Sequence, residues 1–363
     1  MDITTVGVDL AKEVITVCAM DRSGHVVQAR NLRVADFSEW LIQLQTGTVV
    51  GMEACSGAHF WARKMQAMGL VAKLMAAEFV QPFRKSRSAK NDHNDAEAIA
   101  IAVRQAQMRF VTIKTEAQQA RLAGHRLREG WKEERTALIN RTRGLLLEFG
   151  YPLARSTKAF TVGLQAALLH RALPGQFRIL LTQVQQQLQQ LDQQLAECDR
   201  TIALSAKQDE HCQRLQAQPG IPQEDFLRGV GPISADALSA TVGNARDFKN
   251  GRQFAAWLGL TPRQYSSGGK TKLGRISRRG DAYLRTLLVQ GAKSTLQSAI
   301  KKAPNLLSRM QQWILKLYGR VGYHKTLVAI ANKHARQVWA MLAKGEEYDQ
   351  EAWKRFAKEA AAQ

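Results

Sequence analysis

Long apolar runs are absent from this sequence. No segment reaches about 18 consecutive apolar residues, the length that a membrane-spanning helix needs. The chain opens MDITTVGVDLAK, with an acid at the second position and without an apolar signal region or a lipidation signal. We therefore expect a cytoplasmic protein with no membrane partner. Hydrophobic residues still make up 45% of the 363 residues, which is enough for packed cores in two to three domains.

Cysteine is scarce as well. The four cysteines are Cys18, Cys55, Cys198 and Cys212, and no two of them form a C-x-x-C pair. This spacing predicts neither a structural zinc site nor a redox motif. We interpret all four as reduced thiols.

Acidic residues are few compared with basic ones. The chain has 31 Asp and Glu against 52 Lys and Arg, and its formal net charge of +21 favours a polyanionic partner, foremost nucleic acid. Residues 251–325 contain 15 Lys and Arg and a single acid, Asp281. Because glycines interrupt this run and acids are nearly absent, it favours a phosphate-binding surface over an ordinary solvated face. The predicted nucleic-acid-binding residues here are Arg263, Lys270, Lys272, Arg275, Arg278, Arg279 and Arg285. A second basic run, R-K-S-R-S-A-K, adds Arg84, Lys85, Arg87 and Lys90.

Residues 1–115 alternate short β-rich runs with helical patterns. TTVGVDLA, VITVCAM and HVVQARNL are followed by a helix, TVVGMEA, another helix and VAKLMAA. In the first of these helices one apolar face is formed by Phe37, Trp40, Leu41 and Leu44. The order predicts an α/β domain and is the one expected of an RNase H-like sheet, although periodicity alone also fits another mixed sheet.

Residues 116–215 have an almost wholly helical pattern. Apolar residues in LLTQVQQQLQQLDQQLAECDRTI recur at alternating steps of three and four, forming a seam of Leu181, Val184, Leu188, Leu191, Leu195, Cys198 and Ile202. Such a seam predicts a coiled-coil arm, and these arms commonly join protomers. An intramolecular helical hairpin would give the same pattern.

Residues 216–345 predict a third, basic and mostly α-helical domain, and residues 346–363 a terminal helix. Near its start, LRGVGPISADALSATVG places Gly229 and Gly231 between two short helical patterns, which resembles a helix-hairpin-helix turn. Glycines in that motif let backbone N–H groups approach a phosphate closely. A plain tight turn explains the glycines equally well.

Acidic residues stand at three places in the N-terminal domain where they could converge. Asp9 ends an apolar run, where an unpaired acid is costly, and Glu53 has the matching position after a second run. Asp92 and Asp95 lie three residues apart at a predicted helix start, so both can face one point. Four carboxylates suit one or two Mg²⁺ ions, which take oxygen ligands and stabilise phosphodiester cleavage. Helix capping by Asp92 is the competing interpretation.

Two serines stand inside the C-terminal basic run. Ser266 and Ser267 precede Gly268 and Gly269, in a loop that can bring a hydroxyl close to a phosphate. Such a stretch is usually only a flexible loop. No base is evident beside it, and an unactivated hydroxyl is a weak nucleophile. The surrounding cations could stabilise charge on an attacked phosphate, or simply bind phosphate.

With these motifs in place, the sequence resembles the IS-one-ten (IS110) family of bacterial insertion-sequence transposases, the bridge-RNA-guided recombinases. The likeness covers nearly the whole chain. It is carried by G-V-D-L-A-K, G-M-E-A-C-S-G, K-N-D-H-N-D-A-E, G-L-T-P-R-Q-Y-S-S-G-G-K and R-I-S-R-R-G-D-A-Y-L-R in this order. The resemblance implies a RuvC-like domain with a D-E-D-D metal site, a coiled-coil insertion and a C-terminal transposase domain with a catalytic serine. It also implies a nucleoid-associated bacterial protein.

Matched by motif, the implied metal ligands and catalytic acids are Asp9, Glu53, Asp92 and Asp95, and the implied nucleophile is Ser267, uncertain by one position because Ser266 adjoins it. Mg²⁺ is the implied cofactor, with Mn²⁺ as a substitute. The implied partners are DNA at the element ends and target, a guide RNA, and further copies of the chain in a dimer or tetramer joined by the coiled coil. Asn91 and His93 depart from the family's commonest threonine and arginine, but neither change removes a carboxylate.

Three functional hypotheses follow. The first is a recombinase that excises and inserts a mobile element, cutting and rejoining DNA at an active site composed of both domains, with the serine becoming linked to a DNA phosphate. The second is a RuvC-like Mg²⁺-dependent endonuclease of branched DNA, which needs the acids but no serine. The third is a non-enzymatic architectural protein, whose salt-dependent nucleic-acid binding would not depend on Mg²⁺ or on Asp9.

Overall fold

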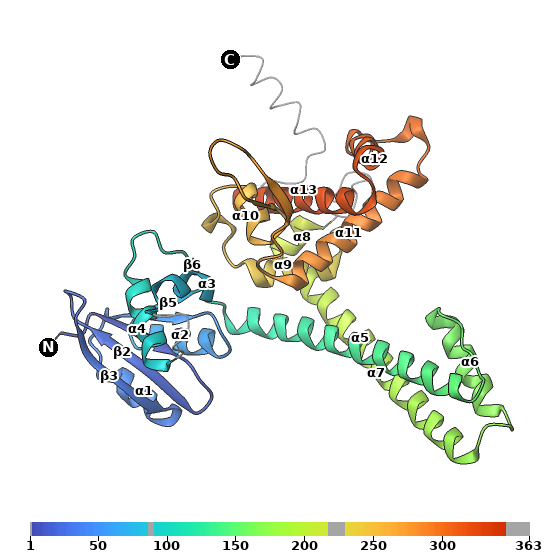
Figure 1. Ribbon diagram of the computed structural model, residues 1–363, viewed down its shortest axis with the longest axis horizontal. Coiled ribbons are helices and arrows are strands. Elements are labelled where there is room, and N and C mark those ends of the chain that lie inside the picture. The colour runs from blue at the N-terminus through green and yellow to red at the C-terminus, as the bar shows by residue number, and fades with distance from the viewer. Residues whose placement is uncertain (1, 86–90, 217–228, 346–363) are drawn as a thin grey trace. The chain divides into compact units, whose positions relative to one another are not determined.

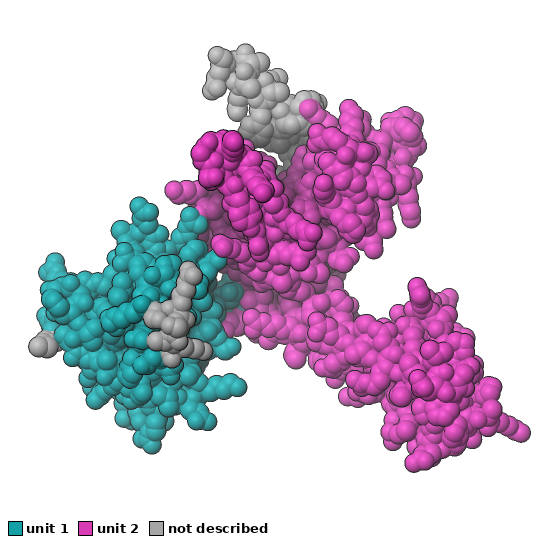
Figure 2. Space-filling view, viewed as in Figure 1, with its two compact units in different colours: residues 1–118 teal, residues 119–363 magenta. Residues whose placement is uncertain are grey.

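The chain folds into two compact units. The computed structural model describes residues 2–85, 91–216 and 229–345. Unit 1 covers residues 1–118 and unit 2 covers residues 119–363 (Figure 2). The boundary falls near the start of helix α5 (Glu116–Glu148). The functional division at residues 115, 215 and 345 stays a prediction, and the predicted helix 346–363 lies outside the described residues.

A mixed β-sheet forms the centre of unit 1, with the strand order β3-β2-β1-β4-β5-β6 (Figure 1). Strand β1 pairs antiparallel with β2 and parallel with β4. The β2–β3 and β5–β6 pairs are antiparallel, and the β4–β5 pair is parallel. The strands are β1 (Thr5–Asp9), β2 (Val14–Met20), β3 (Val26–Arg33), β4 (Val49–Glu53), β5 (Val71–Met75) and β6 (Phe110–Val111). The predicted α/β domain and the order of its elements are thereby confirmed.

Helices cover both faces of this sheet. They are α1 (Val34–Ile42), α2 (Ala58–Ala67), α3 (Ala77–Val80), the short 3₁₀ helix η1 (Gln81–Phe83) and α4 (Asp92–Val103). Of the predicted apolar face of α1, Phe37, Trp40 and Leu41 are buried, whereas Leu44 follows the helix end and packs against the same core. Val6 and Val8 of β1 join this core, so the residues that alternate with them lie on the opposite face, toward α4.

Two glycines let α4 lie directly on the sheet. A Cβ atom on Gly7 would stand 2.1 Å from the Ala96 carbonyl oxygen, and one on Gly51 would stand 2.8 Å from Val103 Cβ. Alanines line the contacting side of α4, where Ala96 and Ala100 are buried with Cys18 and Met20. This close approach brings the N-terminal end of α4 to the strand ends that carry Asp9 and Glu53.

Helices α5 and α7 (Gly175–Gln208) form an antiparallel hairpin, with α6 (Thr157–Leu169) at its far end (Figure 1). Ion pairs between Arg128 and Asp199 and between Arg135 and Asp192 join the two long helices. Along the predicted seam of α7, Leu181, Leu191 and Ile202 are buried, and Val184, Leu188, Leu195 and Cys198 are half-buried. The seam therefore packs within one chain as a helical hairpin, and its role in joining protomers stays a prediction.

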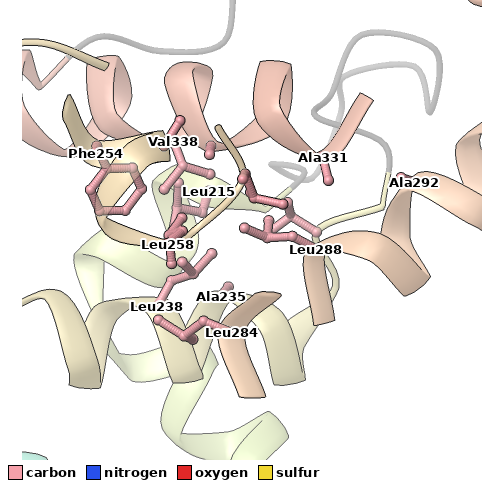
Figure 3. Packing of buried hydrophobic residues seen from close by; sticks show 14 of the residues in the cluster. Leu215, Ala235, Leu238, Phe254, Leu258, Leu284, Leu288, Ala292, Ala331 and Val338 are labelled. Carbon is pink, nitrogen blue, oxygen red and sulfur yellow. The ribbon is translucent and has the colours of Figure 1, made fainter. Parts of the chain in front are cut away.

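A helical core completes unit 2. Leu238, Leu258, Leu284, Leu288 and Val338 meet inside it (Figure 3). Its helices are α8 (Glu210–Leu215), α9 (Pro232–Val242), η2 (Ala245–Asp247), α10 (Gly251–Trp257), α11 (Ala282–Lys301), η3 (Pro304–Leu306), α12 (Arg309–Val321) and α13 (Tyr323–Lys344). The mostly helical C-terminal part is as predicted. Among the described helices, none is both long and apolar enough to cross a membrane.

The predicted helix-hairpin-helix glycine has a packing role. Gly229 has a positive φ of 94°, and a Cβ atom there would stand 2.5 Å from the carbonyl oxygen of Gly291 in α11. Helix α9 begins directly afterwards, with Gly231 at its N-cap. The first helix of the motif falls in residues 217–228, outside the described residues. The phosphate-binding interpretation of this turn stays a prediction.

Candidate carboxylate site and basic hairpin

Asp9 and Glu53 end two adjacent parallel strands. The β1–β4 register pairs Val8 with Met52, so the next residue of each strand is one of the two acids. Asp9 lies two residues after Gly7, and Glu53 lies two residues after Gly51, so both acids are on the same face of the sheet as these glycines, the face toward α4. The fold thus places the two predicted carboxylates at one sheet edge, beneath the start of α4.

The first turn of α4 supplies the other two predicted acids. Asn91 is the N-cap residue, and its side chain accepts a hydrogen bond of 3.0 Å from the His93 N–H. The capping interpretation of Asp92 is therefore wrong, because Asn91 already occupies that position and Asp92 is the first helical residue. Asp92 is exposed, whereas Asp95 is only 7% exposed.

The four acids act on one another electrostatically. Burial, and then the charges of Asp95, Asp92 and Glu53, raise the pKa of Asp9 to about 6. Burial is also the largest cause that raises the pKa of Glu53, and Asp95 adds to it. Like charges that repel so strongly need a counter-charge to remain ionised together. The sequence-predicted set Asp9, Glu53, Asp92 and Asp95 is thus one electrostatic cluster.

Arg84 supplies part of that counter-charge. Its Nη2 lies 3.3 Å from Glu53 Oε1, and its Nε lies 3.0 Å from Asp95 Oδ1. The adjacent Lys85 pairs with Glu97, with 2.7 Å between Lys85 Nζ and Glu97 Oε2. Two residues predicted to bind nucleic acid are therefore paired with acids of this unit. The other two of that run, Arg87 and Lys90, lie outside the described residues.

The chemistry of the cluster fits a hard divalent cation. Its donors are all carboxylate oxygens, the ligands that Mg²⁺ and Mn²⁺ take. Over the described ranges, however, no three Asp, Glu, His or Cys side chains lie close enough together to hold one metal ion. The guanidinium of Arg84 stands between Glu53 and Asp95. A cation that bound both carboxylates would have to take its place.

The predicted nucleophile lies on an exposed β-hairpin of unit 2. Strands β7 (Pro262–Gln264) and β8 (Leu273–Ile276) pair antiparallel, and a bridge between Ser267 and Lys270 extends them. Gly268 and Gly269 have φ values of 55° and 77°, the positive values that a two-residue type I′ turn needs at both central positions. The glycines therefore form a tight turn that presents Ser267 to solvent.

The two serines of the hairpin differ in their surroundings. Ser266 Oγ accepts a hydrogen bond of 2.8 Å from the Gln264 side chain. Within the described part of the chain, no side chain hydrogen-bonds to the Ser267 hydroxyl. Both residues are exposed. In the described ranges, no basic catalytic group is hydrogen-bonded to either serine.

The predicted basic residues around the hairpin differ in their surroundings. Lys270, Lys272 and Arg275 are exposed on the hairpin itself. By contrast, Arg285 donates from Nη1 to the carbonyl oxygens of Leu258 and Arg279, both at 3.1 Å, and so fixes the loop that follows β8. The exposed group remains available to an external anion. The remaining predicted residues, Arg263, Arg278 and Arg279, are exposed at the base of the hairpin.

Comparison with known proteins identifies the family of the chain. A family model described as "Transposase IS116/IS110/IS902 family" matches residues 226–307, and a DEDD transposase model of IS110 elements, described as "Transposase", matches residues 6–151. A "Probable family 20 transposase" of Pseudomonas aeruginosa is 41% identical over 95% of this chain and 98% of its own length. The chain belongs to the IS116/IS110/IS902 family of transposases.

Other transposases of insertion sequences show the same end-to-end similarity. The transposase for IS1111A of Coxiella burnetii is 38% identical over 96% of this chain and 92% of its own length. The transposase for IS1328 of Yersinia enterocolitica is 34% identical over 95% and 98%. As a member of this family, the chain is a DNA-processing enzyme of transposition, and the two matched regions contain the carboxylate cluster and the basic hairpin.

The transposase also contains a buried polar cluster that the sequence analysis missed. Arg121 of α5 pairs with Asp209 and with Asp236, the latter at 2.7 Å, and His125 Nε2 lies 2.9 Å from Asp236 Oδ2. On its other side, His125 Nδ1 lies 2.9 Å from the Tyr283 hydroxyl of α11. His125 and Asp236 are each only 1% exposed. The signal was an acid inside the apolar run ISADALSATV, the same signal that marked Asp9.

Proposed function

We propose that this transposase cuts and rejoins DNA with a divalent-metal site held by Asp9, Glu53, Asp92 and Asp95, and with Ser267 as the nucleophile. The observation that supports the proposal best is the convergence of Asp9 and Glu53, on parallel strands, with the first turn of α4. The strand order, with antiparallel β1–β3 followed by parallel β4 and β5, agrees with the RNase H-like, RuvC-like fold expected from the sequence.

A bound Mg²⁺ would polarise the phosphodiester and stabilise the charge on its oxygens. The protein's own part would be to carry the four carboxylates on one sheet edge and on the helix start that packs against it. Asp9 and Glu53 are held by the strand pairing, and Asp95 is held by the contact of Ala96 with Gly7.

Ser267 supports a covalent route. Attack of its hydroxyl oxygen on a DNA phosphorus would form a serine–phosphate ester, break the bond to one deoxyribose oxygen, and pass the serine proton to that leaving oxygen. Attack of a free deoxyribose hydroxyl at the opposite DNA end on this phosphorus would form the new phosphodiester, break the serine–phosphate bond and pass the hydroxyl proton to the serine oxygen. Lys270 and Lys272, exposed beside the turn, would bind the phosphate being attacked.

The partners we propose are DNA at the element ends and target, a structured guide RNA, and further copies of the chain. The surplus of basic residues in 251–325 suits nucleic acid of either kind. The half-buried part of the α7 seam offers Val184, Leu188 and Leu195 for contact between protomers.

An excision assay tests the proposal. Cells that carry a plasmid with the element express the wild-type protein, Asp9→Asn or Ser267→Ala. The rejoined donor junction is then amplified. We expect each variant to lower excision by about a hundredfold or more, because each removes one essential group. Ser266→Ala and Asp36→Asn, a surface acid, are the controls and should excise normally.

The runner-up is a RuvC-like endonuclease that needs the carboxylates alone, a reading that the lack of a base beside Ser267 favours. It predicts that Ser267→Ala still cuts DNA while Asp9→Asn does not. The architectural reading predicts DNA binding with no cutting by any variant and no effect of Mg²⁺.

A further inference from the structure

Arg84 holds an unusual place among the acids of unit 1. It follows η1 and turns inward, so that its guanidinium bridges Glu53 of the sheet and Asp95 of α4. Its side chain is 32% exposed, against 18% for Glu53 and 10% for Asp95. The charged end of a long side chain at the beginning of a basic run is thus directed at two carboxylates rather than presented to solvent.

The guanidinium of Arg84 lies close to both acids, but its hydrogen-bonding capacity is not fully used. Arg84 Nε lies 3.0 Å from Asp95 Oδ1, yet its N–H is not directed at that oxygen and makes no hydrogen bond. Of the two contacts of Arg84 with Glu53 and Asp95, the one from Nη2 to Glu53 has hydrogen-bond geometry. A forked guanidinium that fits its partner makes two parallel hydrogen bonds to one carboxylate. Here the fork is shared between two acids on different elements, and such a contact is easily exchanged.

The charge at this position is also unbalanced. Four carboxylates, those of Asp9, Glu53, Asp92 and Asp95, are set against the one positive charge of Arg84, which leaves a formal charge of −3. A divalent cation neutralises more of this charge than a guanidinium does, and it accepts oxygen ligands from several carboxylates at once. Arg84 and a metal ion cannot both lie between Glu53 and Asp95.

We propose that Arg84 competes with the divalent cation for Glu53 and Asp95, so that metal binding requires its guanidinium to leave the cluster. The inference rests on the proposed metal site. Arg84 would hold the carboxylates together before loading and would then become a free cation at the start of the basic run. Lys85 would stay on Glu97, which lies outside the four-acid set.

The opposite role makes the opposite prediction. If Arg84 were a fixed support that orients Glu53 and Asp95 for the metal, its removal would weaken metal binding. If Arg84 competes, its removal tightens metal binding. The sign of the change in metal affinity therefore separates the two roles without any measurement of DNA cleavage.

The test is a calorimetric titration of the full-length protein with Mn²⁺ in the absence of nucleic acid. We expect Arg84→Gln to bind Mn²⁺ about tenfold more tightly than the wild type, because a competing charge is removed from a half-buried site. Arg84→Lys keeps the charge and should stay near the wild-type affinity. Lys85→Gln is the matched control and should also bind as the wild type does.

Thermal unfolding gives an independent measurement on the same variants. In EDTA, Arg84→Gln should unfold at a lower temperature than the wild type, because the four acids lose their counter-charge. Added Mg²⁺ should then raise its unfolding temperature by more than it raises that of the wild type. A folded Arg84→Gln protein with unchanged or weaker Mn²⁺ affinity would overturn the inference.

A further variant separates failure of this inference from failure of the proposed function. Asp9→Asn should lose Mn²⁺ binding if the metal site is correct. Loss in Asp9→Asn together with no gain in Arg84→Gln leaves the metal site standing and refutes the role of Arg84. No Mn²⁺ binding by the wild type or by Arg84→Gln refutes both.

Discussion

At the scale of single residues, glycines and alanines allow the close contact between α4 and the sheet that positions the carboxylates. Gly7 and Gly51 lack the two Cβ atoms that would hold α4 away from the sheet, and Asp95 directly precedes Ala96, which lies against Gly7. Arg84 then bridges acids that would otherwise only repel. The positions of the carboxylates therefore depend on small residues that have no functional group in their side chains.

Replacing Gly7 by alanine tests this dependence. The new Cβ would overlap the Ala96 carbonyl at 2.1 Å, so α4 must shift, and we expect a loss of about 1–3 kcal/mol in the free energy of unfolding. Mn²⁺ affinity should fall with it. Chemical denaturation measures the first effect and calorimetry the second. Gly130→Ala, in α5 with nothing within 4 Å of the new Cβ, should be neutral or slightly stabilising. An unshifted unfolding midpoint for Gly7→Ala would show that α4 does not depend on this contact.

At the same scale, the sequence predicted the acids but not their partners. Asp9 and Glu53 could be found because an acid at the end of an apolar strand is a local signal. The roles of Arg84 and Asn91 could not be found. The basic run predicted nucleic-acid binding and not pairing with acids, and both Asn91 and Asp92 are good N-cap residues. Pairings such as His125 with Asp236 join residues 111 positions apart, and no local pattern reveals them.

At the scale of elements, a buried polar cluster connects the α5–α7 hairpin to the helical core of unit 2. Arg121 of α5 connects to Asp209 at the start of α8 and to Asp236 of α9, and His125 connects the same helix to Tyr283 of α11. The heptad pattern predicted α7 itself, whereas the ion pairs with α5 and the buried contacts between the two helices show that the hairpin closes within one chain. A buried cluster of this kind fixes the direction in which α5 leaves the core, because breaking one partner leaves an uncompensated charge.

The pH dependence of the free energy of unfolding tests the contribution of the Arg121–Asp209 ion pair. Burial alone would raise the pKa of Asp209, but hydrogen bonds from the Cys212 N–H and the Arg121 guanidinium lower it to about 2. A lowered folded-state pKa contributes stability above the unfolded value near 4, and this stability is lost as pH falls toward 2. Asp209→Asn keeps the N-cap but loses the charge. We expect it to cost about 2 kcal/mol at pH 6 and nearly nothing at pH 2, by denaturation at each pH. An equal cost at both pH values would contradict the ionic contribution.

At the scale of the whole molecule, charge is distributed unevenly along the chain. Helices α11, α12 and α13 contain no acid from residue 282 to residue 344, whereas the four acids of the proposed metal site all belong to unit 1. The sequence predicted this uneven distribution, and the fold adds that Lys270, Lys272 and Arg275 are exposed on one hairpin, near Ser267.

The salt dependence of DNA binding measures how many phosphates the hairpin cations neutralise. Replacing Lys270, Lys272 and Arg275 together by glutamine should weaken binding and lower the slope of log Kd against log salt by up to about 3, because each of the three cations would neutralise one phosphate. A control with Arg126, Arg141 and Lys158 replaced by glutamine removes the same charge from the helical arm. Equal slopes for the two triple variants would show that net charge, and not the hairpin, governs binding.

The most direct test of a serine recombinase with a carboxylate site is the search for protein joined to DNA. The protein is incubated with Mg²⁺, DNA carrying the element ends and target, and RNA transcribed from the element's non-coding flank, and is then run on a denaturing gel. We predict a covalent adduct with the wild type and with Ser266→Ala, and none with Ser267→Ala or Asp9→Ala. Cut DNA without an adduct, or an adduct that persists in Ser267→Ala, would contradict the assignment of Ser267 as the nucleophile.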